Sequence, residues 1–216
     1  VAWPGKSEIA EFLGEPGKFS PYAVHIEIPP SEIPAIKERR AGIQDEGSQI
    51  LAMVFAAAAA NQQPWLDLCA GPGGKAALLS HLTKENFYAN EVSEARAELV
   101  RQVVRTGSEV KVEDGREIQL AVKSIMADVP CTGLGALRRR PEVRWRRSAN
   151  DLPGLTKLQY ELAEHAIEIL PSGGIFAYAT CSPHMVETRA QCATIEKKLA
   201  VNKLDISDYL PENLQN

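Results

Sequence analysis

The sequence predicts an α/β fold built on an open, doubly wound, mostly parallel sheet. Short apolar runs alternate with helical patterns through the middle of the chain, as they do where crossover helices join parallel strands. A glycine-rich turn at residues 70–74 follows the first of these runs and opens a helical pattern. The length of 216 residues, with 44% hydrophobic and 24% charged residues, suits one globular domain with a sizeable core.

Each element of this fold has a local reason. Residues 46–60 form an apolar helical run that should stop before Pro64, because proline cannot continue a helix. Apolar residues recur at spacings of three and four between Leu155 and Ile169, which predicts an amphipathic helix. The other predicted helices are Gly74–Leu82, Ala95–Val104 and Glu187–Ala200. The predicted strands are Trp65–Cys69, Phe87–Glu91, Val110–Glu113, Ser124–Asp128 and Gly174–Thr180.

The chain divides into two parts by periodicity. Residues 1–40 are proline-rich and weakly periodic, which predicts an N-terminal appendage, the remnant of a preceding domain. Residues 41–216 carry the alternating pattern and form the predicted main domain.

Composition limits the classes of protein that this chain can belong to. The longest apolar stretch, residues 50–60, is too short to span a bilayer, and no basic-then-apolar leader opens the sequence, so we expect a cytoplasmic monomer. Four cysteines without a CxxC pair predict neither a structural zinc site nor a disulfide framework, and we expect no metal. A net charge of −4 means that nucleic-acid binding would require a local basic patch.

The glycine-rich turn allows a cofactor to approach bare backbone, and its spacing selects among cofactors. A dinucleotide site requires GxGxxG, but here the glycines occupy positions 71, 73 and 74. A phosphate loop requires a glycine where Cys69 stands and a hydroxyl residue where Ala76 stands. S-adenosylmethionine, which carries no phosphate, remains as the predicted cofactor.

Acidic and basic side chains near the turn could hold the parts of that cofactor. Glu91, at the end of the second strand, could bind the ribose hydroxyls, and Asp114 could accept from the adenine amine. Asp67 and Lys75 could hold the methionine portion. The alternative is a glycine-rich turn with scattered surface acids.

Two cysteines follow predicted strands, Cys131 in ADVPCTG and Cys181 in YATCSP, and should point into one crevice. A thiolate that adds to carbon 6 of cytosine makes carbon 5 nucleophilic enough to attack a methyl donor. A cation such as Lys75 would favour that thiolate, and Cys131 is placed to assist release of the product. Asp128 could hydrogen-bond the pyrimidine and stabilise the charge that builds there. A strand-end DPPY or NPPY would instead indicate methylation of an exocyclic amine.

Residues 138–147 contain six arginines and one tryptophan, although the whole chain is acidic. Arginines bind phosphates in pairs of hydrogen bonds, and aromatic faces stack on unpaired bases. We therefore expect RNA contact here, with a solvated basic loop as the alternative. The predicted RNA-binding residues are Arg138, Arg139, Arg140, Arg144, Trp145 and Arg146.

The chain resembles the RsmB/Sun group of RNA cytosine-C5 methyltransferases. The matching strings are GIQDEGSQ (42–49), LDLCAGPGGK (66–75), NEVSEAR (90–96), EDGR (113–116), ADVPCTGLGALRRRPEVRWRR (127–147) and GGIFAYATCSPHMVET (173–188). The resemblance implies a Rossmann-like class I methyltransferase with S-adenosylmethionine as donor, Cys181 as nucleophile and Cys131 as the residue that assists release. It implies cofactor contacts from Cys69, Ala70, Gly71, Pro72, Gly73, Gly74, Lys75, Glu91, Asp114 and Asp128.

The resemblance also implies a substrate and marks some departures. Similar members modify small-subunit ribosomal RNA, and relatives modify transfer RNA, so residues 41–216 would be the catalytic domain and ribosomal RNA the expected partner. Glu91 stands where the family usually has Asp, and the stretch from Asp114 to Asp128 is shorter than usual. The family's preceding RNA-binding domain and final β-hairpin are not in this sequence, so we expect a catalytic fragment, or a chain with segments left out. A binding module without catalysis and a nucleotide-dependent oxidoreductase are the alternative functions.

Overall fold

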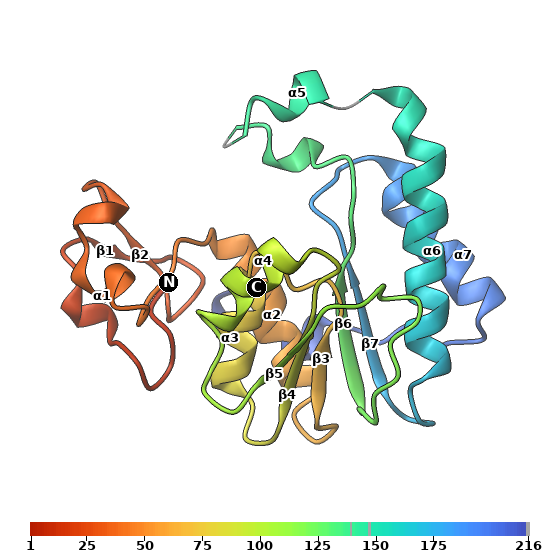
Figure 1. The fold of residues 1–216 in the computed structure, drawn as a ribbon, viewed down its shortest axis with the longest axis horizontal. Coiled ribbons are helices and arrows are strands. Elements are labelled where there is room, and N and C mark those ends of the chain that lie inside the picture. Colours follow the sequence, from red (N-terminus) through yellow and green to blue (C-terminus); the bar gives the residue numbers. More distant parts are fainter. Residues whose placement is uncertain (139, 147, 215–216) are drawn as a thin grey trace.

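The computed structural model, which describes residues 1–138, 140–146 and 148–214, confirms the predicted fold class. Five strands form one parallel sheet in the order β5-β4-β3-β6-β7, with helices on both faces (Figure 1). The strands are β3 (Trp65–Asp67), β4 (Phe87–Asn90), β5 (Glu109–Lys111), β6 (Ser124–Asp128) and β7 (Ile175–Ala179). The main helices are α2 (Glu46–Ala58), α3 (Gly74–Leu82), α4 (Glu94–Arg101), α6 (Leu152–Glu168) and α7 (Arg189–Lys198).

Shorter elements surround this sheet. A two-stranded antiparallel ribbon near the N-terminus pairs β1 (Glu15–Pro16) with β2 (Val24–His25). Single-turn helices are α1 (Pro34–Lys37) and α5 (Val143–Arg146). Turns of 3₁₀ helix are Ile9–Glu11, Pro30–Glu32, Leu134–Ala136, Ala149–Asp151, Met185–Glu187, Ser207–Tyr209 and Glu212–Leu214. None of the helices in the described ranges is long and apolar enough to cross a membrane.

Every predicted strand and helix of the main domain is present, with bounds that differ by up to three residues. Strand β6 and helix α3 have the predicted bounds. Helix α4 ends at Arg101 rather than at Val104, because the N–H of Val103 turns back onto the carbonyl of Val100, three residues earlier, as in a 3₁₀ turn. Helix α7 begins two residues late because Glu187 closes a 3₁₀ turn instead.

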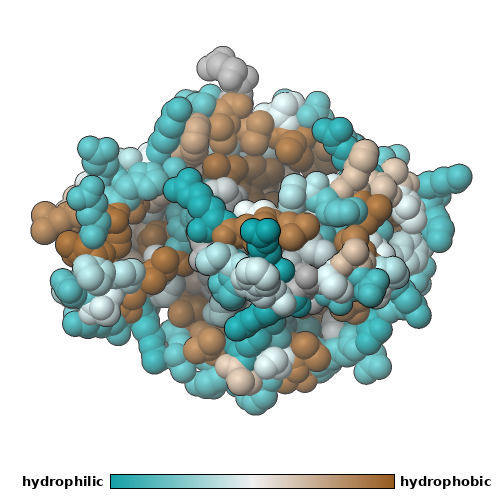
Figure 2. Space-filling view, turned by 90° about the horizontal axis from the view of Figure 1, so that it is seen from above, coloured by the Kyte–Doolittle hydropathy of each residue, from teal (hydrophilic) through white to brown (hydrophobic). Residues whose placement is uncertain are grey.

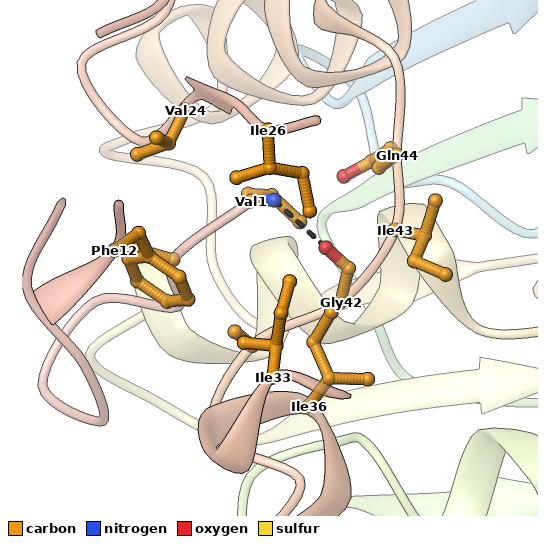
Figure 3. Close-up of a pocket in the computed structure, with 11 residues that line it drawn as sticks. Val1, Phe12, Val24, Ile26, Ile33, Ile36, Gly42, Ile43 and Gln44 are labelled. Carbon is orange, nitrogen blue, oxygen red and sulfur yellow. Dashed lines mark hydrogen bonds between the residues drawn. The ribbon is translucent and has the colours of Figure 1, made fainter. Parts of the chain in front are cut away.

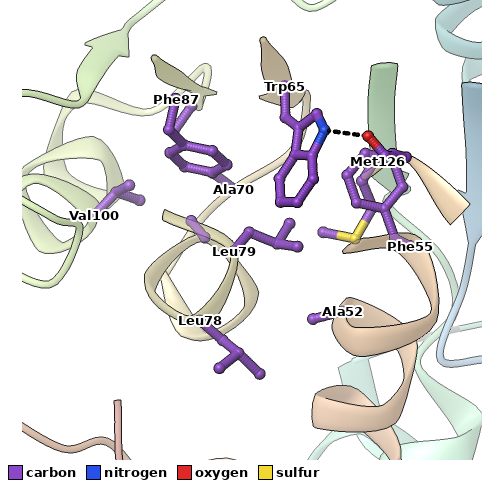
Figure 4. Close-up of a cluster of buried hydrophobic side chains, with 12 residues drawn as sticks. Ala52, Phe55, Trp65, Ala70, Leu78, Leu79, Phe87, Val100 and Met126 are labelled. Atoms are coloured by element: carbon purple, nitrogen blue, oxygen red, sulfur yellow. Dashed lines mark hydrogen bonds between the residues drawn. The ribbon is translucent and has the colours of Figure 1, made fainter. Parts of the chain in front are cut away.

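Side chains alternate across the sheet and build a core on each face. On one face, Trp65 of β3, Phe87 of β4 and Met126 of β6 pack against α2, α3 and α4 (Figure 4). The Trp65 indole donates to the carbonyl of Ala59 at 3.0 Å, so this buried polar group is satisfied. On the other face, the next residue of each strand packs against α6. A helix on each face makes the sheet doubly wound.

The N-terminal segment forms its own small cluster beside α2, α3 and α4, at the left of Figure 1. An isolated antiparallel bridge joins Ala2 to Ala41, and the Trp3 ring stacks on His81 of α3 with centroids 5.9 Å apart. That this segment is the remnant of an RNA-binding subdomain stays a prediction.

The strand order places a switch point between β3 and β6. Helix α3 leaves β3 toward one face, whereas α6 follows β6 on the other, so a crevice opens where the two strands end. Figure 2 shows the molecule from above, with teal polar residues between separate brown apolar patches. Because β3, β6 and β7 are parallel neighbours, the loops that follow them meet at the carboxyl ends of the strands.

Candidate active site

The loop after β3 shapes the first wall of the crevice. Gly73 has φ +109°, a left-handed conformation that strains any residue with a Cβ. Gly71 donates its backbone N–H to Oε2 of Glu91 at 3.1 Å, and a Cβ at Gly71 would collide with that carboxylate. The turn thus presents bare backbone beside an acidic side chain, as the sequence predicts.

Glu91 is buried, at 4% exposure, and held from three sides. Besides Gly71, it accepts from the N–H of Ser93 at 3.0 Å and pairs with the guanidinium of Arg96 at 3.3 Å. The same guanidinium donates to the carbonyl of Gly71. Arg96 therefore fixes the turn and the acid together, a role that could not be predicted from the sequence because the Gly71 carbonyl lies 25 positions away in the chain.

Asp67 is almost fully buried, at 1% exposure, and its Oδ1 has no hydrogen-bond partner. Burial raises the pKa of Asp67 to about 7, and the nearby Asp128 carboxylate adds to the shift. A buried carboxylate oxygen without a hydrogen-bond partner is costly, which makes this position suited to an incoming cation. Burial likewise raises the pKa of Cys69, so that thiol is neutral and a poor nucleophile.

Lys75 and Asp128 form an ion pair across the crevice. Nζ of Lys75, in the first turn of α3, lies 2.6 Å from Oδ2 of Asp128 at the end of β6. Both side chains are largely shielded from solvent, at 17% and 28% exposure. The pair joins the loop after β3 to the end of β6.

The two predicted site cysteines converge. Sγ of Cys131 and Sγ of Cys181 lie 3.3 Å apart, although the residues are 50 positions apart in the chain. The hydrogen bond from Cys181, helped by Thr180 and by backbone N–H groups, lowers the pKa of Cys131 to about 6. The pKa of Cys181 is raised because its proton is held by Cys131. The pair therefore carries one proton and one negative charge at neutral pH.

A cavity of about 390 Å³ opens beside this pair, within the range of small-molecule sites. It brings together Lys75 from the first turn of α3, Asp128 from the end of β6 and Cys181 from the loop after β7, and residues at the start of α2 also line it. Its lining residues are Asp45, Gly47, Ser48, Leu51, Lys75, Asp128, Gly135, Thr180, Cys181, Ser182 and Pro183.

Asp114 lies in the loop after β5, where Arg116 binds its carboxylate. Arg116 donates to both of its oxygens, at 3.0 and 2.6 Å, and reaches Glu161 of α6 at 2.8 Å. These hydrogen bonds lower the pKa of Asp114 to about 2, so it is ionised at all ordinary pH values. Its predicted contact with adenine stays a prediction.

The basic stretch forms an arm that projects beyond the sheet at the top of Figure 1. Trp145 of α5 is 84% exposed, and the guanidinium of Arg144 lies 5.7 Å from its ring centroid. Arg138, Arg140 and Arg146 are also exposed. Arg139, the remaining predicted RNA contact, lies outside the described residues.

A second, smaller cavity of about 80 Å³ lies within the N-terminal part of the chain, between residues 1 and 44 (Figure 3). Apolar side chains such as Phe12, Ile26 and Ile33 line it, and the amino group of Val1 donates to the carbonyl of Gly42 at 2.7 Å. It contains no cluster of groups that could carry out chemistry, so we place the site at the cysteine pair.

Comparison with known proteins finds relatives by sequence and by fold. Residues 54–215 match the family described as 16S rRNA methyltransferase RsmB/F. A Mycobacterium tuberculosis (strain ATCC 25618 / H37Rv) protein that carries the name methyltransferase is 44% identical over 202 residues, covering 89% of this chain and 44% of the relative. Ribosomal RNA small subunit methyltransferase B of Yersinia enterocolitica is 33% identical over 190 residues, covering 83% of this chain and 44% of the relative.

A solved structure shares the fold. NSun6 from Pyrococcus horikoshii, crystallised with SFG, superposes with a TM-score of 0.66 at 23% identity, over 78% of this chain and 45% of that one. The chain spans less than half the length of the curated relatives it matches. Since the family match covers most of the chain, and both relatives exceed 30% identity over most of its length, the chain belongs to the 16S rRNA methyltransferase RsmB/F family.

Proposed function

We propose that this chain is the catalytic part of an enzyme that methylates carbon 5 of a cytidine in small-subunit ribosomal RNA. The observation that carries the proposal is the pair of thiols 3.3 Å apart, beside Lys75 and Asp128 at one cavity. The names of the family and of the Yersinia relative support ribosomal RNA as the substrate. Transfer RNA is the alternative substrate.

The residues of the crevice fit S-adenosylmethionine as the methyl donor. The unpartnered Oδ1 of Asp67 would accept from the cofactor's ammonium group, and Glu91 would accept from its ribose hydroxyls. The absence of a Cβ at Gly71 lets the Glu91 carboxylate lie directly against the turn, where a bound ribose could reach it. When bound, S-adenosylmethionine would supply an electrophilic methyl group.

The cysteine pair would generate and recycle the nucleophile. As Sγ of Cys181 forms a bond to carbon 6 of cytosine, its proton passes across the 3.3 Å contact to the Cys131 thiolate. Asp128 accepts a hydrogen bond from the pyrimidine, while Lys75 holds that carboxylate in place. Carbon 5 then takes the methyl group.

Product release would use Cys131 a second time. The half-buried Cys131, whose pKa is about 6, returns its first proton to water at neutral pH. Its thiolate then takes the proton from carbon 5, and the bond between Cys181 and carbon 6 breaks. The cytosine ring regains its aromatic form, and Cys181 leaves as the thiolate, which takes the proton back from Cys131 so that the pair again carries one proton.

The exposed arm with Arg144 and Trp145 would bind the RNA around the target base. Guanidinium groups pair with phosphates and the indole stacks on an unpaired base. Since a base inside a duplex cannot reach the cysteines, we expect a loop or a flipped nucleotide as the target.

Two substitutions test the proposal. Cys181→Ala should abolish methylation, and Cys131→Ser should accumulate a covalent protein–RNA adduct that migrates slowly in a denaturing gel. Bisulfite sequencing of ribosomal and transfer RNA from a strain lacking the protein should reveal the lost 5-methylcytidine. Substantial turnover by Cys181→Ala would refute the nucleophile, and cofactor or RNA binding without any adduct would indicate a binding module.

A further inference from the structure

One buried carboxylate has no part in the chemistry proposed above. Among the described residues, three carboxylates are buried: Asp67, Glu91 and Glu187. The first two border the glycine turn, whereas Glu187 follows Cys181 by six residues and is 0% exposed. Burying a charge without partners is very unfavourable, so the partners of Glu187 indicate what it does.

The first partner of Glu187 is the loop that carries Cys131. Oε1 accepts the backbone N–H of Thr132 at 2.9 Å, and Oε2 accepts the Thr132 hydroxyl at 2.5 Å. Thr132 is the residue directly after Cys131 and is itself buried. Glu187, in the Cys181 loop (residues 180–188), therefore binds the Cys131 loop (residues 129–133) through two hydrogen bonds.

The second connection returns to Cys181. Oγ of Ser182, directly after Cys181, lies 3.0 Å from Oγ1 of Thr132. Since Thr132 donates its proton to Glu187, its oxygen accepts from Ser182. The residues that follow the two cysteines are thus joined to each other and to one carboxylate, without solvent access.

Helix α6 binds the carboxylate of Glu187, and strand β7 binds its backbone carbonyl. Nε2 of Gln159 donates both to Oε1 of Glu187 at 3.0 Å and to the carbonyl of Pro130 at 2.9 Å. The Tyr178 hydroxyl donates to the carbonyl of Glu187 at 2.8 Å. Pro130 precedes Cys131, so the network brackets that cysteine on both sides.

Glu187 remains charged in this setting. Burial alone would raise its pKa, but the surrounding hydrogen-bond network of Ser182, Thr132 and Gln159 outweighs burial and holds the pKa below its usual value. Hydrogen bonds to a charged acceptor are shorter and stronger than neutral ones. The Glu187 carboxylate is therefore ionised, and its hydrogen bonds are strong, in the pH range where the Cys131 thiolate forms.

We propose that Glu187 is a positioning residue that locks the Cys131 and Cys181 loops together and so sets the distance between the two sulfur atoms. It contacts neither sulfur in any hydrogen bond of the described structure and acts through Thr132 and Ser182. The effect of Glu187 on methylation rests on the function proposed above. The geometric claim, that Glu187 sets the distance between the two sulfur atoms, does not depend on that function.

The geometric claim can be tested without RNA. Diamide takes two electrons and two protons from the thiols as an Sγ–Sγ bond forms, and mass spectrometry of the peptides gives the rate for Cys131–Cys181. Glu187→Gln should slow this rate at least tenfold, because an amide has one acceptor oxygen and would place its NH2 group against either the N–H or the hydroxyl of Thr132, which donate to different oxygens of Glu187. Thr132→Val should slow it similarly, whereas Thr132→Ser, which keeps the hydroxyl, should retain it within twofold.

Glu46→Gln is the matched control. Glu46 is a shielded carboxylate that accepts two backbone N–H groups, from Phe19 and Ser20 at 2.8 and 2.9 Å, but it serves the N-terminal segment. This variant should leave the rate of disulfide formation unchanged. An unchanged rate in Glu187→Gln, or equal rates in the two Thr132 variants, would overturn the proposal, with folding checked by circular dichroism.

Activity provides a separate readout. On 16S ribosomal RNA, Glu187→Gln and Thr132→Val should lower kcat at least tenfold with KM changed less than twofold, because RNA contacts are intact. If the unsubstituted protein methylates no RNA, the proposed function fails and the disulfide measurement still decides the role of Glu187. If methylation occurs and Glu187→Gln retains its kcat, the positioning role is wrong although the function stands.

Discussion

Substituting Asp67 with Asn should change how stability depends on pH. Asp67 is 1% exposed, with its pKa raised by burial from 3.8 to about 7. Between these values the folded state binds a proton that the unfolded state has released. The stabilising contribution is therefore complete below pH 3.8 and lost as pH rises through about 7. A shift of about three units corresponds to about 4 kcal/mol.

Urea unfolding at pH 4.5 and pH 8 measures this effect. The unsubstituted protein should lose about 3–4 kcal/mol relative to Asp67→Asn over that interval, since the amide does not titrate. Cys131 also titrates in this range, so the difference between the two proteins is the quantity to compare. Parallel stability curves for the two proteins would refute the reasoning.

The same variant tests the fit of the cofactor. An ammonium group that pairs with Asp67 would lower its pKa and replace the missing partner of Oδ1. S-adenosylhomocysteine should therefore stabilise the unsubstituted protein more at pH 8 than at pH 5.5. In Asp67→Asn the added stability should be smaller at both values, and equal stabilisation of the two proteins would contradict a contact at this position.

Three further outcomes are expected. Iodoacetamide should alkylate the cysteine pair with a midpoint near pH 6, and Cys181→Ala should raise the midpoint for Cys131 because alanine has no donor to replace the thiol that donates to it. Trp145→Ala should change stability by less than about 0.5 kcal/mol but weaken RNA binding about tenfold in a filter assay, whereas Leu13→Ala, at a site 86% exposed, should not. Gly71→Ala should cost about 1–3 kcal/mol in thermal unfolding and weaken binding of S-adenosylhomocysteine, because the added methyl group would collide with the carboxylate that its N–H binds.

The elements that local pattern decides were predicted well. Ser124–Asp128 is buried along most of its length and has the predicted bounds as β6, since a short apolar run between polar loops leaves few alternatives. The ends of α4 and α7 were wrong by up to three residues, because backbone turns at those ends depend on packing against other elements. The N-terminal ribbon and single-turn helices carry too little periodicity to be predicted.

The convergence of the cysteines was predictable, but the means of holding them was not. Parallel strands β6 and β7 are neighbours, so residues that follow them must meet, and the sulfur contact follows from topology. Thr132 and Gln159, which donate to the Glu187 carboxylate, lie 55 and 28 positions away. An acidic residue near the start of a helix suggests only a favourable interaction with the helix dipole, so sequence alone cannot distinguish this anchor from an ordinary surface acid.

The strand order also explains why the site combines chemistry from distant segments. Because β3 lies between β4 and β6, the loop after β3 can reach Glu91 on one side and Asp128 on the other. Lys75 is 53 positions from Asp128, yet their contact requires only that two adjacent strands end at the same level. A methyl donor bound over the glycine-rich turn would then lie next to a cytosine bound at Cys131 and Cys181. Substitutions that shift the register of β6 should therefore harm both halves of the site at once, whereas substitutions in the arm should affect RNA binding alone.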